Sequence, residues 1–200
     1  MAIVGKDGKI AAMNVGNLGD LEKRMKTQLD ALIAGKPVPT FASAQPPQRK
    51  RPALELVGKK APSFSIKTID GKPLGDSDFA NHPATVLNFV APNCGFCKRQ
   101  IPNVEKIRQE YEAKGVRFVN VAQKMRKDYT TEETVKVFEG VGSKLELATE
   151  FTNTVGGLYK ATSYPTMMVV DSSGKIRHVN IGAKADLDKL VKGQLDALIK

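Results

Sequence analysis

The chain has 200 residues, of which 41% are hydrophobic and 26% are charged. These shares are close to globular averages and fit one or two small domains, which excludes a globally disordered chain and a large multidomain machine. No apolar run approaches the ~20 residues of a membrane-spanning helix, and the first residues lack the charged-then-apolar order of a signal peptide. The composition predicts a globular protein.

The net charge of +10 would suit a nucleic acid or an acidic partner. The basic residues are nevertheless spread along the chain, and the only dense run, Gln48 to Arg51, lies among prolines. The chain has no Trp and only 6% aromatic residues, so it lacks the aromatic-flanked basic motif of an RNA-binding sheet. We therefore expect no nucleic-acid partner and interpret the run as a solvated linker.

The number and spacing of the cysteines limit the kinds of site that the chain can form. The only two cysteines lie in one motif, Cys94-Gly95-Phe96-Cys97, which excludes a disulfide-stapled fold and a four-cysteine zinc site. The only two histidines, His82 and His178, do not have the spacing of a zinc finger. We expect no metal and no cofactor, and redox chemistry becomes the leading hypothesis.

An internal repeat links the two ends of the chain. Residues 2–34 align without a gap on residues 168–200, with about half the positions identical and the stretch QLDALI shared in full. Each copy predicts a strand, a turn, a second strand and an amphipathic helix. The turns fall at Asp7-Gly8 and Ser173-Gly174.

The repeat determines the expected domain boundaries. Because the stretch between Gly58 and Thr166 has no counterpart before Ala2, residues 1–36 are predicted to be the tail of a truncated preceding domain of the same type. The alternative is an N-terminal extension that packs on the complete domain or on another chain. A hairpin and a helix cannot bury their apolar faces alone, so residues 1–36 are expected to self-associate in that case.

Residues 37–57 are rich in proline and basic residues, which predicts a linker. Residues 58–200 are predicted to form the complete domain. In this domain strands alternate with helices before the final hairpin, which predicts an α/β fold with a mixed sheet. The expected strands are 63–68, 85–90, 116–121 and 145–148. The expected helices begin at the cysteine motif and end at Gly115, cover 131–139, and make one turn around 154–159.

The cysteine motif lies directly between a buried strand and an amphipathic helix. The unpaired N–H groups and the dipole of that helix face the Cys94 sulfur and favour its thiolate. Two intervening residues place Cys97 one turn inside the helix, where it is less accessible and within bonding reach of Cys94. We therefore predict Cys94 as the nucleophile and Cys97 as the resolving thiol of a redox disulfide. The alternative is a buried structural pair.

Several motifs together identify a family. Residues 58–200 resemble the thioredoxin-like superfamily, and within it the TlpA/ResA-type thiol-disulfide oxidoreductases with a redoxin-like domain. The resemblance rests on residues 58–64 with Asp70-Gly71-Lys72, on residues 87–97, on Pro102, on Tyr164-Pro165-Thr166, and on residues 169–171 and 174–176.

The resemblance implies a thioredoxin-like fold, a central mixed β-sheet flanked by helices with an N-terminal hairpin. It places a cis-proline loop at Tyr164-Pro165 facing the cysteines and makes Phe96, Tyr164 and Pro165 the substrate-binding residues. It also implies protein thiol or disulfide substrates, an upstream thiol electron donor, no cofactor and a periplasmic or other extracytoplasmic location. A membrane anchor would have to lie in a part of the protein that precedes this sequence.

Three residues depart from the family pattern. Asn93 replaces the usual Trp before the first cysteine, and the amides Asn88 and Gln100 replace carboxylates. An acid–base group for Cys97 is therefore missing, which leaves the direction of exchange open. Because of these departures we retain a second hypothesis, a thioredoxin-fold binding or scaffold module with a structural disulfide. A peroxidase or copper-delivery relative is disfavoured, since no peroxidatic motif is seen.

Overall fold

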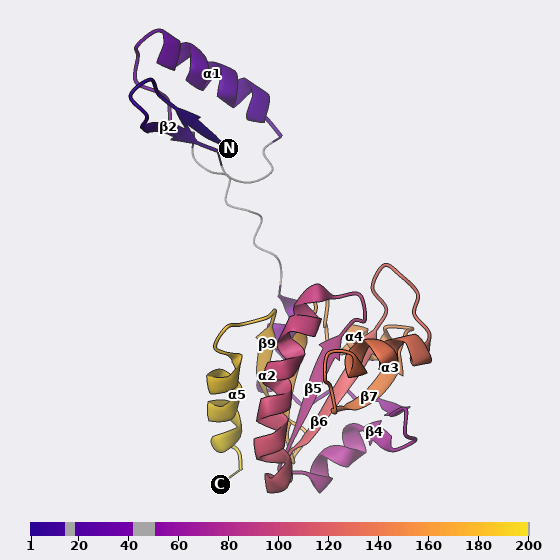
Figure 1. Cartoon of the computed structure of the whole chain (residues 1–200). Coiled ribbons are helices and arrows are strands. Elements are labelled where there is room, and N and C mark those ends of the chain that lie inside the picture. Colours follow the sequence, from indigo (N-terminus) through magenta and orange to yellow (C-terminus); the bar gives the residue numbers. More distant parts are fainter. Residues whose placement is uncertain (15–18, 42–50, 200) are drawn as a thin grey trace. The chain divides into compact units, whose positions relative to one another are not determined.

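The computed structural model describes residues 1–14, 19–41 and 51–199. The chain forms two compact units, Met1–Lys50 and Arg51–Lys200 (Figure 1). The second unit begins before the predicted boundary at Gly58, because a short 3-10 helix ahead of it contributes Ala53 and Leu56 to the core. Most of the basic run of the predicted linker lies outside the described residues.

The first unit is a hairpin with one helix. Strands β1 (Ala2–Val4) and β2 (Ile10–Met13) pair antiparallel, and helix α1 (Leu21–Ile33) follows. The turn between the strands contains Gly8 at a φ of 75°, a left-handed conformation that favours glycine. The amide of Asn14 donates to Oε1 of Gln28 over 2.8 Å, which ties the end of the hairpin to the helix.

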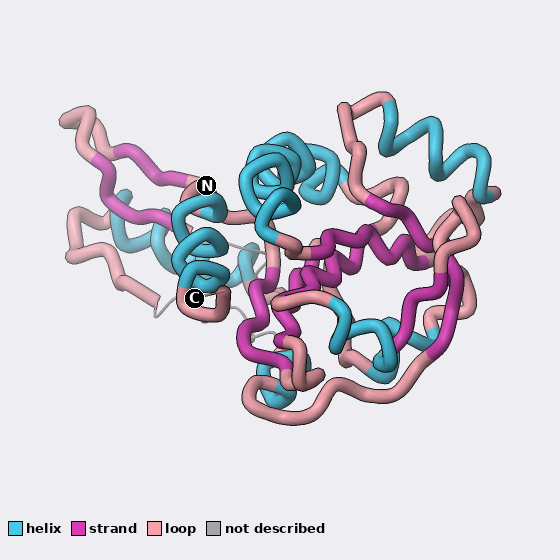
Figure 2. The backbone as a smooth tube through the Cα atoms, turned by 90° about the horizontal axis from the view of Figure 1, so that it is seen from below, coloured by secondary structure: helices cyan, strands magenta, loops and turns pink. Residues whose placement is uncertain are grey.

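The second unit is built on a five-stranded sheet in the order β7-β6-β5-β8-β9, with helices on its faces (Figures 1 and 2). Strands β5, β6 and β7 run parallel, whereas β8 pairs antiparallel with both β5 and β9. The hairpin of β3 and β4 precedes this sheet. The predicted mixed sheet with flanking helices and an N-terminal hairpin is thus confirmed.

The elements of the second unit have the following bounds. The strands are β3 (Ser65–Lys67), β4 (Pro73–Gly75), β5 (Ala84–Val90), β6 (Arg117–Gln123), β7 (Glu146–Glu150), β8 (Thr166–Asp171) and β9 (Ile176–Ile181). The α-helices are α2 (Gly95–Tyr111), α3 (Thr131–Glu139), α4 (Thr154–Leu158) and α5 (Leu187–Asp196), and the 3-10 helices are η1 (Pro52–Leu56), η2 (Asp76–Asn81) and η3 (Glu112–Lys114).

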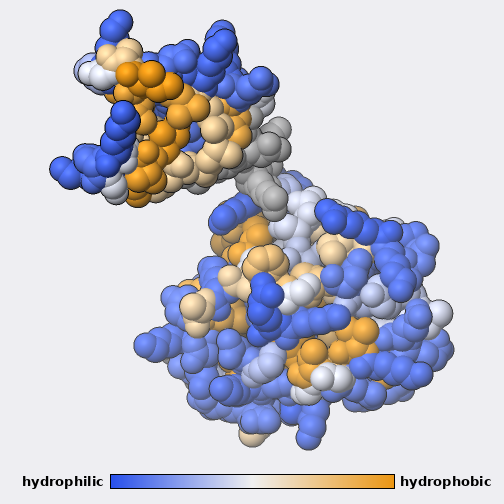
Figure 3. Space-filling model, turned by 45° about the horizontal axis from the view of Figure 1, so that its top comes forward, coloured by the Kyte–Doolittle hydropathy of each residue, from blue (hydrophilic) through white to orange (hydrophobic). Residues whose placement is uncertain are grey.

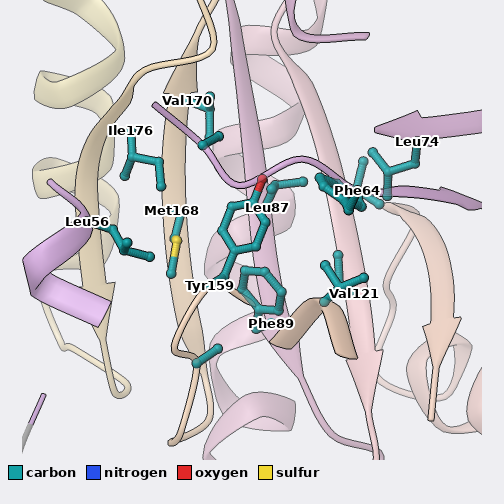
Figure 4. Close-up of a cluster of buried hydrophobic side chains, with 14 of the residues drawn as sticks. Leu56, Phe64, Leu74, Leu87, Phe89, Val121, Tyr159, Met168, Val170 and Ile176 are labelled. Carbon is teal, nitrogen blue, oxygen red and sulfur yellow. The ribbon is translucent and has the colours of Figure 1, made fainter. Parts of the chain in front are cut away.

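Strand β5 is buried along its whole length, as expected of a central strand covered on both faces. Because side chains alternate along a strand, Leu87 and Phe89 enter the core on one side of the sheet, where Tyr159 packs against Phe89 (Figure 4). Val86 enters the second core, which α2 and α5 cover. The strand therefore has a fixed position when it reaches the cysteine motif.

Helices α2 and α5 lie side by side (Figure 1). At the end of α2 the Tyr111 hydroxyl donates to Oδ1 of Asp196 over 2.7 Å and lies 3.3 Å from the carbonyl oxygen of Lys192. Lys192 also pairs with Glu110. These polar contacts join α5 to the helix that carries the cysteines.

We predict that Tyr111→Phe lowers the free energy of unfolding by about 1 kcal/mol, the net value of one hydrogen bond. Urea denaturation followed by circular dichroism measures this change. Tyr129→Phe is the control, because it removes the same atom from a partly exposed ring that lies beside the Lys127 ammonium. An equal loss in both variants would contradict the assigned role of the Tyr111 hydroxyl.

Candidate functional site

The two cysteines lie where β5 passes into α2. Cys94 is the N-cap residue of α2, and its sulfur accepts a hydrogen bond from the backbone N–H of Cys97 over 3.1 Å. A disulfide joins the two side chains. Cys94 is 5% exposed and Cys97 is 0% exposed, so only the first of the two residues reaches the surface.

The first turn of α2 carries positive charge. It contains no acidic residue, and Lys98 and Arg99 follow the cysteines directly. The Arg99 guanidinium lies 4.5 Å from the centroid of the Phe96 ring. That ring is 60% exposed, which makes it an apolar surface with a cation above it next to the reactive motif.

The loop before β8 faces the cysteines. Its Tyr164-Pro165 peptide bond is cis, and the carbonyl oxygen of Tyr164 lies 3.7 Å from Sγ of Cys94. The antiparallel register explains this proximity, since Thr166 pairs with Phe89 near the end of β5. The structure thus brings Cys94, Cys97 and Tyr164 together, although Cys94 and Tyr164 are 70 residues apart in sequence.

The two amides that the sequence analysis singled out lie in the interior of the domain. Asn88 and Gln100 are both buried, and the Asn88 amide donates to Oδ1 of Asn120 over 2.8 Å. Within the described part of the chain, Oδ1 of Asn88 and Oε1 of Gln100 have no hydrogen-bond partner. Since an amide does not release or take up a proton near neutral pH, neither group acts as an acid or base.

Asn93 has a structural contact that its place in the motif did not predict. Its side-chain amide donates to the carbonyl oxygen of Met125 over 2.6 Å. This bond joins the turn before Cys94 to the segment that follows β6. It holds the turn at the same edge of the sheet where the parallel strands end.

Glu150 is a buried carboxylate that sequence reasoning missed. It ends β7 and accepts hydrogen bonds from the backbone N–H of Val155 over 3.0 Å and from the side-chain amide of Gln123 over 3.2 Å. Burial first, and then the negative charge of Glu150, raise the pKa of the Tyr164 phenol above its usual value. The ends of parallel strands meet at one sheet edge, so an acidic residue just after the predicted strand 145–148 was a usable signal.

In the described residues, His, Cys, Asp and Glu side chains form no cluster of three or more that could hold a metal ion. None of the described helices is both long and apolar enough to cross a membrane. The arrangement at the cysteines itself offers one kind of chemistry, the exchange of a disulfide with external thiols.

Residues 56–193 match the Redoxin family. The chain belongs to this family. Among its relatives, the thioredoxin-like protein YneN of Bacillus subtilis is 28% identical over 139 residues, which cover 70% of this chain and 79% of that protein. The thiol-disulfide oxidoreductase ResA of Bacillus thuringiensis (strain Al Hakam) is 26% identical over 145 residues, covering 72% of this chain and 77% of that protein.

Solved structures agree with this assignment. A putative thiol:disulfide interchange protein DsbE from Chlorobium tepidum has a TM-score of 0.64 and 25% identity, and the match covers 72% of this chain and 98% of that one. This Redoxin-family chain therefore has a thioredoxin-like fold and is a TlpA/ResA-type thiol-disulfide oxidoreductase.

We predict that Glu150→Gln lowers the pKa of the Tyr164 phenol, because removing the nearby negative charge eases formation of the phenolate. The pKa stays above its usual value, since burial is the larger cause. Carbon-13 NMR of the tyrosine rings against pH measures the change, and Tyr164→Phe assigns the signal. Glu55→Gln, which alters a surface partner of Lys160, is the control and leaves the Tyr164 titration in place. An unchanged titration in Glu150→Gln would contradict the coupling.

Proposed function

We propose that this oxidoreductase exchanges protein disulfides and thiols through the Cys94–Cys97 pair. The observation that carries the proposal is the position of Cys94 as N-cap of α2, where the N–H of Cys97 donates to its sulfur. A donated N–H and the helix dipole both stabilise negative charge on that sulfur. Cys94 is therefore the nucleophile, and the fully buried Cys97 is the resolving residue.

The exchange runs in two steps that balance electrons. The Cys94 thiolate attacks one sulfur of a substrate disulfide, which forms a mixed disulfide and releases the other substrate sulfur as a thiolate. The Cys97 thiolate then attacks Sγ of Cys94, which releases the second substrate thiolate and closes the Cys94–Cys97 disulfide. Two electrons pass from the protein dithiol to the substrate, and the reverse sequence oxidises a substrate dithiol.

Proton transfer at Cys97 follows from the buried amides. Because Asn88 and Gln100 cannot accept the Cys97 proton, water or the departing substrate thiolate takes it as the mixed disulfide resolves. This arrangement makes resolution depend on the substrate that is bound over the motif. An upstream thiol protein returns the pair to the dithiol when the chain acts as a reductant.

The substrate segment lies between Phe96 and the cis-proline loop in this proposal. The exposed Phe96 ring offers apolar contact area beside Cys94. The backbone of Tyr164, whose carbonyl lies 3.7 Å from the Cys94 sulfur, pairs with an extended substrate strand next to Pro165. We place the activity in the periplasm or another extracytoplasmic compartment, in line with the resemblance to the TlpA/ResA-type proteins.

The test uses two matched substitutions and insulin as the protein disulfide. Cys94→Ser reduces insulin reduction to the uncatalysed rate, because the nucleophile is lost. Cys97→Ser accumulates a mixed disulfide with insulin, seen as a mass adduct that dithiothreitol removes. If neither variant changes turnover, or if Cys97→Ser forms no adduct beyond what Cys94→Ser forms, the disulfide is structural and the proposal is wrong.

Phe96→Ala tests the substrate surface. Loss of an apolar contact of about 1 to 2 kcal/mol raises KM for a protein disulfide roughly 5- to 30-fold. The rate with a small disulfide such as oxidised glutathione stays unchanged, because that molecule does not span the ring. Leu54→Ala, which truncates another exposed hydrophobic side chain, leaves both rates unchanged. Equal slowing of both substrates in Phe96→Ala would contradict a substrate-binding role for the ring.

A further inference from the structure

The first unit exposes hydrophobic side chains on one face (Figure 3). Val4 on β1 is 57% exposed and Ile10 on β2 is 60% exposed. Their counterparts in the repeat, Val170 and Ile176, are both 0% exposed. Surfaces of this kind on a folded unit mark an interaction site.

Where both copies of the repeat are described, their hairpins have the same local structure. The hairpin pairs Ile3 with Ala12 and Val4 with Ile10, with an irregularity between Ile3 and Val4. The second copy has the same register and the same irregularity, which lies between Val169 and Val170. We call residues 1–34 the first module and residues 167–200 the second module.

A polar side-chain pair recurs as well. Asn14 donates to Gln28 over 2.8 Å in the first module, and Asn180 donates to Gln194 over 2.9 Å in the second. Both pairs join the end of the hairpin to the helix that follows it. The first module is therefore folded as the second is, although it is built in a separate unit.

The second module shows how the buried face of such a hairpin and helix packs in this fold. It fills a slot formed by the edge of β5, the side of α2 and the core beneath η1, with Val169 opposite Val86 in the sheet. Each buried hydrophobic position of the second module has a hydrophobic counterpart in the first. The pairs are Met167/Met1, Met168/Ala2, Val169/Ile3, Val170/Val4, Ile176/Ile10, Leu187/Leu21, Val191/Met25 and Leu195/Leu29.

The polar residues that contact the slot have identical counterparts in the first module. Lys192 pairs with Glu110 of α2, and Asp196 accepts from the Tyr111 hydroxyl. The first module has Lys26 and Asp30 at the corresponding positions of α1. The first module thus carries the same set of apolar and polar groups by which the second module packs on its core.

We propose that the first module docks into the slot of a thioredoxin-like core whose own terminal strand–strand–helix is absent. Its β1 edge pairs antiparallel with the β5-type strand of that core, and α1 packs beside the α2-type helix. Within the described residues each chain has two modules and one slot, which the second module fills. A second copy of the chain therefore brings no vacant slot, and the occupant is a core of this fold with the slot open.

A chimaeric chain tests whether the first module fits such a slot. Residues 168–199 of the full chain are replaced by the sequence of residues 2–33. We expect the chimaera to fold with a single cooperative thermal transition, and the same chimaera carrying Leu195→Asp to lose it. A chimaera without a cooperative transition would overturn the proposal.

An open-slot chain tests docking between molecules. Val169→Asp and Leu195→Asp in the full chain disable the second module, and Leu29→Asp disables the first, so the core has a vacant slot. Refolded together with this chain, tagged wild-type protein retains it in a 1:1 complex, whereas a tagged Leu29→Asp chain does not. Equal retention by both tagged chains, or by neither, would overturn the proposal.

Light scattering of the wild-type chain alone tests whether a second copy of the chain covers the first module instead. Two first modules could pair edge to edge through β1 and give a dimer that Leu29→Asp dissolves. The proposal expects a monomer at concentrations where the open-slot chain is bound. A wild-type dimer of equal strength would assign the surface to a second copy and contradict the proposed occupant.

Discussion

Strand β5 fixes the second unit, because it pairs with β6 on one edge and β8 on the other and is buried on both faces. Its end determines where α2 begins, and Cys94 is the N-cap residue of that helix. The antiparallel partner β8 brings the Tyr164-Pro165 loop to the same edge. A sheet that holds three segments in register thus positions a sulfur, the N–H that caps it and a carbonyl beside it.

The edge of β5 that pairs with β8 also shows what a copy of the repeat does in this fold. In the second unit the edge of β5 is covered by β8. Helix α5 is joined to α2 by the hydrogen bond of Tyr111 to Asp196 and by the ion pair of Lys192 with Glu110. A terminal strand–strand–helix is therefore an integral part of this fold. The first unit carries a piece of the same local structure, and its Val4 and Ile10 are exposed where their counterparts Val170 and Ile176 are buried. The need to cover the edge of β5 accounts for the position of β8, β9 and α5 in the second unit. The same need relates the exposed face of the first unit to a core of this fold.

Much of the fold could be predicted from the sequence because its signals are local. The apolar run at 85–90 marks a buried strand, the helix that follows it has one apolar face, and Gly115 ends the helical segment in a left-handed conformation. The bounds of β7 were less accurate, since Leu145 precedes the strand and Glu150 ends it. Short strands at a sheet edge are set by pairing with their neighbour rather than by their own residues.

The site was only partly predictable. The spacing of the cysteines and the strand before them indicate the sulfur chemistry, whereas the contact of Asn93 with Met125 and the effect of Glu150 on Tyr164 depend on segments far apart in sequence. The start of the domain was placed too late because η1 is short and directly follows the Pro-rich segment. Its residues Ala53 and Leu56 join the core only once the sheet has formed.

The central claim is that the Cys94–Cys97 pair is a reversible redox couple rather than a structural bond. Equilibrating the chain with graded dithiothreitol or glutathione buffers and counting free thiols measures this directly. The account predicts that both thiols appear together in one reversible two-electron transition, with the fold retained in the reduced form. A pair that stays oxidised in excess dithiothreitol, or a chain that unfolds on reduction, would contradict it.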